Sequence, residues 1–456
     1  MSASAARTVA FEILLRVESE DSYAVELLHS SRLETLSSRD RALATELVIG
    51  ALRWQSLLDH RLAGVSSERL DRLDREVLVA LRLGVYQLEF LTRVPARAAI
   101  FESVELVKAA RKRSAAAFVN AVLRKVDEVG KEDVFAAILN AQNAAGLAHI
   151  AAHPAWLVER WVGAYGLERA RRICSYDQKI PATTIRIHGD ANTQRETEAE
   201  LAANGLNLEP GQLLSAARTI IAGDVIAARA YQDGRLSIQD EGSQLVALVA
   251  SDRELSEGGG ILDCCAAPGG KTGVLARRHP RSRVFATELH PHRARLLRDR
   301  IHLPNVQVLV ADAGRLPFAA RFERILVDVP CSGTGTLARN PEIKWRLKPR
   351  DLLDLQARQA TILKAALAQL AASGRLVYST CSLEPEENEA VVEAVLDRDA
   401  EFELVDMTGE LERLRDGREL PEGVDVASLV DGRYLRTIPG VHDCDGFFAA
   451  MIRRKE

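Results

Sequence analysis

The second half of the chain alternates short apolar runs with amphipathic segments, and this alternation restricts the fold more than any other feature. Runs of this length between helical segments favour parallel strands joined by crossover helices. The longest crossover helix is predicted over Asp351 to Ser373, where Gly374 closes it before the fifth run. The pattern therefore predicts a doubly wound α/β domain over residues 234–456. Its predicted strands lie at 261–262, 283–287, 306–310, 324–327 and 375–378.

The first 145 residues differ from this pattern. They contain only four glycines and one proline, while Ala, Leu, Arg and Glu recur at helical spacing. We expect an all-helical domain over residues 1–145, with Ser38 and Asp71 as N-caps and Gly130 as a C-cap. The fourth helix is apolar nearly all round and is expected at the buried centre. The predicted helices span 4–19, 22–36, 39–62, 71–92, 97–111 and 114–129.

Between these two regions, residues 146–233 mix amphipathic helices with short β-like runs such as Thr183 to His188. We expect a small α+β domain here that links the other two. The 456 residues are thus predicted to form three domains, each large enough to bury a core.

Composition indicates the cellular compartment in which the protein is expected. No run of 18 apolar residues is present, so no membrane span is readable. The N-terminal segment carries Glu12, Glu18 and Glu20 in place of the basic and apolar regions of a secretory signal. Six cysteines in 456 residues are too few for a disulfide scaffold. We expect a protein of the reducing cytoplasm that neither contacts a membrane nor holds a metal, and we expect a monomer.

The net charge of −4 conceals an uneven distribution, because residues 382–456 hold 20 acidic and 9 basic side chains. The rest of the chain is therefore mildly basic. The segment from Val107 to Val126 has six basic residues and no acidic one, which fits either the solvated face of a helix or a nucleic-acid patch. These six residues are Lys108, Arg111, Lys112, Arg113, Arg124 and Lys125.

Polar residues follow every predicted strand of the α/β domain. Ligands of such sheets bind beyond the carboxyl ends of the strands, so these positions form the candidate site. Acidic residues or turns that contain one follow four of these strands. So many acids at one edge of a sheet indicate a binding site, because packing of the fold does not require them. In chain order the positions are the turn from Asp263 to Thr272, then Glu288, Asp312, Asp328 with Pro330 and Cys331, and the turn from Ser379 to Ser382.

The turn at Gly269 and Gly270 lets the backbone approach a ligand closely, and the helix that follows offers its amides to an anion. A Walker A loop would need glycine at Cys265, and no G-x-G-x-x-G dinucleotide motif is present. Glu288 stands where an acid hydrogen-bonds both ribose hydroxyls, and Asp312 is placed to accept from an adenine amino group. Together they suit adenosine without phosphates, which indicates S-adenosylmethionine (SAM).

Two cysteines, Cys331 and Cys381, follow strands that parallel pairing would place side by side. A buried cysteine is usually a small hydrophobic residue, and the spacing does not suit zinc. Beside a SAM site they suggest methylation at C5 of a pyrimidine. That carbon is a poor nucleophile until a thiolate adds to C6.

The motifs LDCCAAPGGKT, ILVDVPCSGTGTLARNPEIKW and LVYSTCSLEPEENEAVV resemble those of the RNA cytosine-C5 methyltransferases of the NOL1/NOP2/Sun family. A helical domain of NusB type before such a catalytic domain, with stretches such as RDRALATELVIGALRW, YQLEFL and AFVNAVLR, resembles the RsmB/Sun (Fmu) branch, which acts on 16S rRNA. The resemblance implies that Cys381 is the nucleophile and that Cys331 assists product release. It also implies that the SAM site is lined by Cys265, Ala266, Ala267, Pro268, Gly269, Gly270, Lys271, Glu288, Asp312 and Asp328.

In the mechanism expected on this basis, the Cys381 thiolate attacks C6 of a flipped or single-stranded cytosine, and Asp328 stabilises the N3-protonated adduct. The resemblance implies the cytosine conventionally numbered 967, in 16S rRNA or in a small-subunit assembly intermediate. Residues 1–145 and 146–233 would then supply RNA binding. Two alternatives stay open: an RNA-binding assembly factor with a vestigial methyltransferase fold, and a nicotinamide dehydrogenase. The intact acids and cysteines argue against the first, and the absent dinucleotide motif argues against the second.

Overall fold

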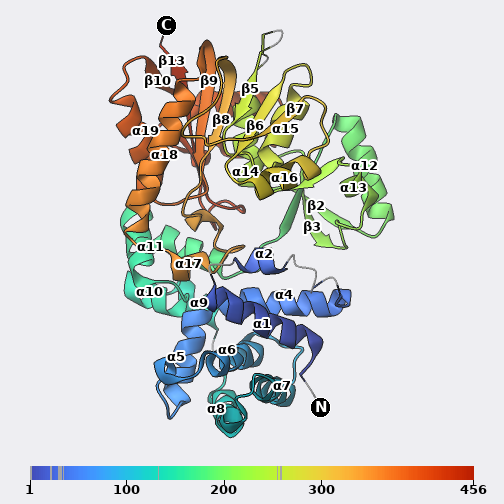
Figure 1. Ribbon diagram of the computed structural model, residues 1–456, viewed down its shortest axis with the longest axis vertical. Helices are drawn as coiled ribbons and strands as arrows, with labels where there is room; N and C mark the ends of the chain where they lie inside the picture. The colour runs from blue at the N-terminus through green and yellow to red at the C-terminus, as the bar shows by residue number, and fades with distance from the viewer. Residues whose placement is uncertain are drawn as a thin grey trace. The chain divides into compact units, whose positions relative to one another are not determined.

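The computed structural model describes residues 3–20, 23–28, 33, 35–131, 133–253, 255–256 and 259–455. The chain divides into two compact units, which Figure 1 traces from the N-terminus in blue to the C-terminus in red. The first unit comprises Met1–Ile180 and Leu337–Arg346. The second comprises Pro181–Thr336 and Leu347–Glu456.

The first unit is built from helices, as predicted. The central helix α6 (Arg75–Phe90) buries residues on all its sides, as its apolar sequence requires. Gly130 ends α8 with a φ of 85°, the left-handed conformation that glycine adopts without strain. The other helices are α1 (Ala5–Ser19), α2 (Ala24–Leu28), α4 (Ser38–Arg53), α5 (Gln55–Val65), α7 (Ala96–Ala109), α8 (Ala116–Val129), α9 (Val134–Leu139), α10 (Ala144–Ile150), α11 (Ala155–Asp177) and α17 (Ile343–Arg346).

Several predicted helix limits are wrong. Ser38 is the first residue of α4, and the N-cap is Ser37, whose hydroxyl accepts from the Asp40 amide at 3.2 Å. Asp71 lies in a 3₁₀ turn, and Asp74 precedes α6. The predicted helix 39–62 is two helices that meet at Trp54. Of the predicted helix 22–36, residues 22, 29–32 and 34 lie outside the described residues.

The first unit also holds the segment Leu337–Arg346, which follows the Cys331 loop in sequence. Lys344 is buried there and donates to the Arg53 carbonyl oxygen at 2.8 Å, while the Trp345 indole donates to the Leu52 carbonyl oxygen at 2.6 Å. Burial lowers the pKa of Lys344 to about 7. The helical unit is therefore completed by residues from the second half of the sequence.

The second unit begins with a small antiparallel sheet in the order β2-β3-β1-β4, which confirms the predicted α+β region. Its core is formed by Ile185 and Ile187 of β1 together with Leu201 of α12 and Leu236 of β4. The elements are β1 (Thr183–Ile187), α12 (Ala191–Ala203), β2 (Asn207–Pro210), β3 (Ala217–Ala222), α13 (Arg229–Gln232) and β4 (Leu236–Ile238).

A larger sheet follows, with the order β11-β12-β13-β9-β8-β5-β6-β7, and β10 pairs with β13. The five predicted strands are present as β5 (Ile261–Asp263), β6 (Val284–Glu288), β7 (Val306–Val310), β8 (Phe322–Asp328) and β9 (Leu370–Thr380), and they are parallel to one another. The sheet as a whole is mixed, because β13 pairs antiparallel with β9. The added strands are β10 (Phe402–Val405), β11 (Val430–Asp431), β12 (Tyr434–Thr437) and β13 (Phe447–Arg454).

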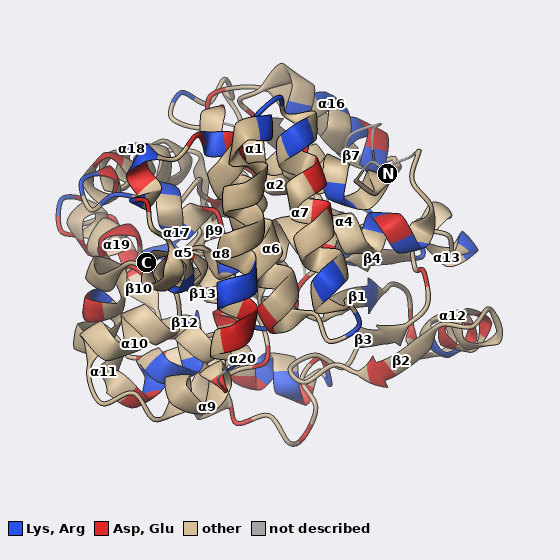
Figure 2. Cartoon of the chain, turned by 90° about the horizontal axis from the view of Figure 1, so that it is seen from below, with Lys and Arg blue, Asp and Glu red and all other residues tan. Residues whose placement is uncertain are grey.

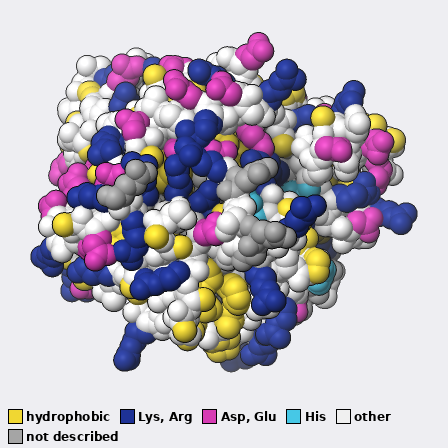
Figure 3. Space-filling model, turned by 90° about the horizontal axis from the view of Figure 1, so that it is seen from above, with side chains coloured by type: hydrophobic (Ala, Val, Ile, Leu, Met, Phe, Trp, Pro, Cys, Tyr) yellow, Lys and Arg dark blue, Asp and Glu magenta, His cyan; other side chains and the backbone are white. Residues whose placement is uncertain are grey.

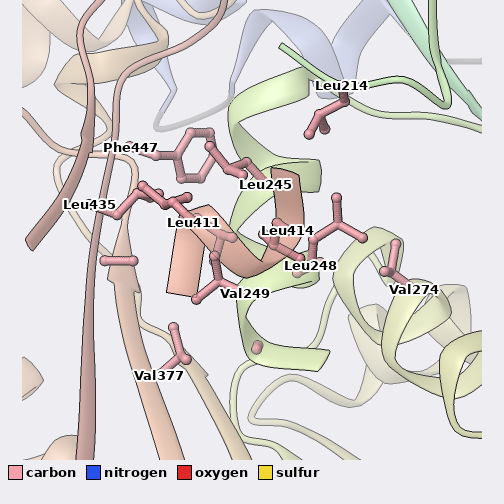
Figure 4. Close-up of a cluster of buried hydrophobic side chains, with 14 of the residues drawn as sticks. Leu214, Leu245, Leu248, Val249, Val274, Val377, Leu411, Leu414, Leu435 and Phe447 are labelled. Atoms are coloured by element: carbon pink, nitrogen blue, oxygen red, sulfur yellow. The ribbon is translucent and has the colours of Figure 1, made fainter. Parts of the chain in front are cut away.

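Helices cover both faces of this sheet. Along β9, Leu376 and Tyr378 join one apolar core and Val377 joins the other, since successive side chains point to opposite faces. Figure 4 shows the core that contains Val377, where α14 supplies Leu245, Leu248 and Val249 and α20 supplies Leu411 and Leu414. The helices are α14 (Glu241–Ser251), α15 (Gly270–Arg278), α16 (Pro291–Arg300), α18 (Asp351–Leu367), α19 (Glu389–Leu396) and α20 (Met407–Asp416).

The predicted end of the crossover helix is wrong. Helix α18 ends at Leu367, and residues expected to continue it already belong to β9. Leu370 pairs with Phe322 of β8, so pairing with a buried strand overrides the helical preference of this alanine-rich sequence. A Cβ atom on Gly374 would lie 2.9 Å from the Phe322 carbonyl oxygen, which explains the glycine.

Among the described residues, no helix is both long and apolar enough to cross a membrane.

Candidate active site

The carboxyl ends of β5, β8 and β9 lie next to one another and carry the candidate catalytic residues. Asp263 at the end of β5 pairs in register with Leu326 of β8, and Asp328 pairs with Ser379 of β9. The parallel register therefore brings together residues up to 116 positions apart in sequence. The turns with Cys331 and Cys381 leave the sheet from these neighbouring strands.

Asp328 is held by two contacts. Lys271 Nζ lies 2.8 Å from Asp328 Oδ2, and the Ser379 hydroxyl donates to Asp328 Oδ1 at 2.7 Å. Burial opposes the charged form of Lys271, but the Asp328 carboxylate, and after it the charge of Cys381, raises the pKa of Lys271 above its usual value. The ammonium also lies 4.9 Å from the centre of the Phe447 ring. Lys271 thus remains a cation beside both Asp328 and Cys381.

The two predicted cysteines meet. Their Sγ atoms are 3.3 Å apart, both residues are half-buried, and both are free thiols. The hydrogen bond with Cys381 and then burial raise the pKa of Cys331 well above its usual value. Cys331 is therefore held as the thiol of the pair and can donate a hydrogen bond to Cys381.

The glycine turn before α15 packs closely against α16. Gly269 has a φ of 108°, and a Cβ atom there would lie 2.6 Å from Leu297 Cδ1, so only glycine fits. The preceding Ala267–Pro268 peptide bond is cis. Burial raises the pKa of Cys265, which fits a lining residue and not a reactive thiol.

The two acids assigned to adenosine lie on the other side of β5. Glu288 ends β6, is buried, and accepts from the His290 amide at 3.0 Å. Asp312 follows β7, is exposed, and accepts from the Gly314 amide at 2.8 Å. Both carboxylates keep oxygen atoms that can accept from a ligand. The structure places them at the predicted edge, and their roles stay predictions.

Sequence reasoning did not assign a role to Asp263. It is fully buried, its Oδ2 accepts from the Thr272 hydroxyl at 2.6 Å, and its Oδ1 has no hydrogen-bond partner among the described residues. Burial raises the pKa of Asp263 to about 7. An acid that directly ends the first strand of such a sheet was the available signal. Its burial depended on packing that sequence does not show.

The fold and this site define the class of methyltransferases that use a SAM-type cofactor. The sequence profile of the 16S rRNA methyltransferase RsmB/F family matches residues 251–453. The NusB family matches residues 4–128, and the ferredoxin-like domain of RsmF/B-like methyltransferases matches residues 153–222. The chain is 35% identical over 463 residues to the probable ribosomal RNA small subunit methyltransferase B of Bacillus subtilis, with 100% of each chain covered. The chain therefore belongs to the RsmB/F methyltransferase family.

Further comparisons agree. The ribosomal RNA small subunit methyltransferase B of Escherichia coli O1:K1 is 31% identical over 428 residues, with 92% of each chain covered. The crystal structure of PH0851 shares the fold with a TM-score of 0.78 at 22% identity, covering 99% of both chains. A methyltransferase homologue from Pyrococcus horikoshii has a TM-score of 0.55 at 26% identity, covering 70% of this chain and 99% of its own.

We predict that Asp263 makes stability depend on pH. In the unfolded chain this carboxyl group titrates near 3.8, whereas in the folded chain its pKa is about 7. Between these values the folded state binds the extra proton, so stability falls as the pH rises from about 4 to 7. The loss is on the order of a few kcal/mol at pH 7. Asp263→Asn removes it, so the melting temperature of the variant should rise relative to wild type across this range.

Thermal unfolding without SAM at several pH values measures this effect. Asp299→Asn, which changes an exposed carboxylate on α16, serves as the control and should follow the wild-type profile. Parallel profiles for Asp263→Asn and wild type would show that Asp263 is ionised throughout the range.

Proposed function

We propose that the protein methylates C5 of a cytosine in 16S rRNA through a covalent adduct between Cys381 and C6 of the base. The observation that carries this proposal is the 3.3 Å contact between Cys331 and Cys381, next to the Lys271–Asp328 ion pair. One thiol is held protonated, and the other lies near a cation. A nucleophile that must add to the base and later leave it needs such a pair.

The residues present fit SAM. The N-terminus of α15 suits a carboxylate, and Glu288 and Asp312 suit ribose hydroxyls and an adenine amino group. The open Oδ1 of Asp263 is a further buried acceptor at the same edge. When bound, SAM supplies an electrophilic methyl group to C5 of the activated base.

The side chains of this chain perform the remaining steps. The Cys381 thiolate forms a bond to C6, and the electron pair displaced from the C5–C6 double bond makes C5 nucleophilic. To Asp328, which Lys271 and Ser379 hold in place, we assign the stabilisation of a proton on N3 of the cytosine. After C5 is methylated, a base removes the C5 proton, the double bond re-forms, and Cys381 leaves as a thiolate that accepts a hydrogen bond from Cys331.

The substrate follows from the relatives and from the domain structure. The curated relatives from Bacillus subtilis and Escherichia coli are named as methyltransferases of ribosomal RNA of the small subunit. By resemblance, we propose the cytosine conventionally numbered 967 as the target. The NusB-type region and residues 146–233 would bind the RNA that carries it. The domain limits at residues 145 and 233 stay a prediction from the sequence, and β4 (Leu236–Ile238) of the small sheet lies just beyond the second of them.

The basic segment of the helical unit is less uniform than its sequence suggests. Lys112 lies 2.9 Å from Asp74 and Lys108 lies 2.7 Å from Glu105, so these two cations are already paired. Arg113, Arg124 and Lys125 are exposed and form no ion pair within the described residues. Figure 2 shows basic residues followed by acidic ones at the end of α8. The face seen in Figure 3 carries both basic and acidic side chains.

We predict that Cys381→Ala abolishes methyl transfer. Without the thiolate C5 is not activated, and loss of a covalent nucleophile lowers the rate on the order of a million-fold. Transfer of a labelled methyl group from SAM to small-subunit rRNA measures the rate, and calorimetry should show unchanged SAM affinity. Cys331→Ala, the matched control, should still form the adduct but turn over slowly. More than trace activity in Cys381→Ala would make Cys331 the nucleophile.

Glu288→Ala and Asp312→Ala should each weaken SAM binding. Each removes a hydrogen bond from an ionised acceptor, which is worth about 1.5 to 3 kcal/mol, or roughly 10- to 150-fold in affinity. Calorimetry measures the dissociation constant, with the exposed Asp299→Ala as a control that should bind as wild type does. Unaltered affinity in both site variants would refute their assignment to the adenosine half.

We also predict that the unpaired cations of the helical unit contact RNA phosphates. Replacing Arg113, Arg124 and Lys125 with Ala should flatten the dependence of log K on log salt by about two, since each phosphate contact contributes about 0.7. The control replaces Lys108 and Lys112, whose carboxylate partners already neutralise them, and should change the slope less. Filter binding of rRNA between about 50 and 200 mM salt measures both. An unchanged slope in the triple variant would assign RNA binding elsewhere.

A further inference from the structure

A buried carboxylate outside the predicted site joins the two cysteine turns. Glu387 lies in the 3₁₀ turn Pro385–Glu387 and is fully buried. Its Oε1 accepts from the Ser332 amide at 2.8 Å and from Gln359 Nε2 at 2.9 Å. Its Oε2 accepts from the Ser382 hydroxyl at 2.5 Å and from the Ser332 hydroxyl. Every one of these donors is neutral, and no cation of the described chain forms an ion pair with Glu387.

The donors are the residues next to the cysteines. Ser332 follows Cys331 and Ser382 follows Cys381, so one carboxylate bonds both turns. The two serine hydroxyl oxygens are 3.0 Å apart, and the Gly335 amide donates to the Cys381 carbonyl oxygen at 2.9 Å. Gln359 of α18 donates to Glu387 and also to the Pro330 carbonyl oxygen at 3.0 Å. The carboxylate is the point at which these contacts converge.

A carboxylate suits these contacts because both of its oxygens accept hydrogen bonds. Four N–H and O–H groups point at the two oxygens, and a carboxylate can accept all of them. An amide in the same place would have to turn its NH₂ group toward the two serine hydroxyls, which would then accept instead of donating. Burying an unpaired charge is costly, so the four bonds must offset its desolvation. Because burying the Glu387 charge is costly, we infer that this residue does more than pack in the core.

The position of the charge also acts on the thiols. The Glu387 carboxylate is among the groups that raise the pKa of Cys331, after the contact with Cys381 and burial. It therefore favours the protonated form of Cys331. Its backbone is fixed too, because the buried Tyr378 hydroxyl donates to the Glu387 carbonyl oxygen at 2.6 Å.

We propose that Glu387 is a positioning residue, which holds the Cys331 and Cys381 turns together so that Cys331 stays the protonated partner of Cys381. Its effect on catalysis rests on the proposed function, whereas its effect on the two thiols does not. The residue does not itself touch the substrate in this account. It acts through Ser332 and Ser382 on the cysteines that precede them.

Two variants of Glu387 test the length of the side chain and its charge separately. Glu387→Gln keeps the size and removes the charge, whereas Glu387→Asp keeps the charge and shortens the side chain by one methylene. Both should loosen the pairing of the turns. The matched control is Glu393→Gln on α19, an exposed carboxylate with a single contact to Tyr434 at 3.3 Å.

The readout is the ratio of Cys331 to Cys381 alkylation by iodoacetamide, measured by mass spectrometry of the two peptides in the intact protein without RNA or SAM. A loss of overall stability would not change this ratio in protein that is shown to be folded. We expect both Glu387 variants to raise it about tenfold, as a shift of one pKa unit does to the thiolate fraction, and the control to stay within about twofold of wild type. Methyl transfer should fall in kcat with the RNA KM unchanged.

A ratio within twofold of wild type in both folded variants would overturn the proposal. A rise in Glu387→Gln but not in Glu387→Asp would also overturn it, because charge alone would then suffice. If Glu387→Gln does not fold, Glu387→Asp decides the matter by itself. Alkylation of the cysteines needs no RNA substrate. The result for Glu387 is therefore valid even if the protein does not methylate cytosine, and failure of the Glu387 proposal can be distinguished from failure of the proposed function.

Discussion

The parallel pairing of β8 with β9 is the constraint on which the site depends. It sets Asp328 opposite Ser379 and makes the two cysteine turns leave the sheet from adjacent strands. A register shift by one residue would turn Asp328 toward the opposite face and separate it from Lys271. Leu376 and Val377 join different apolar cores, so a shift of the register would also move each of them into the core that is packed around the other.

Electrostatics then distinguishes two groups that sequence alone treats alike. Cys331 and Cys381 are both strand-end thiols, yet the Glu387 carboxylate helps to raise the pKa of Cys331, whereas the charge of Cys381 helps to raise the pKa of Lys271. The Lys271–Asp328 ion pair is largely buried, so its two members are tightly coupled. Removing either would leave the other charge buried and unpaired. The same pair fixes the carboxylate that is proposed to meet the base.

The sequence was sufficient for the parts of the fold that follow from local pattern. The five parallel strands, the helical N-terminal region and the buried α6 were predicted from periodicity, and the strand-end rule located the site. The sequence was insufficient where an element is determined by pairing with a strand that is distant in the chain. The antiparallel strand β13 has a continuous apolar sequence whose partner, β9, is more than 60 residues away. The end of α18 was missed for the same reason, because Leu370 pairs with Phe322 in place of extending the helix. Glu387 was missed, and Asp263 was given no role of its own, because an acid in sequence gives no sign of being buried.

The central claim is that Cys381, and not Cys331, bonds to the base. The most direct measurement is to incubate the protein and SAM with small-subunit rRNA that contains 5-fluorocytidine, which cannot lose its C5 substituent and so traps the adduct. Peptide mapping of the RNA-linked protein should then find the nucleotide on Cys381, and the Cys381→Ala protein should form no adduct. A nucleotide on Cys331, or methyl transfer without any trapped adduct, would contradict the account.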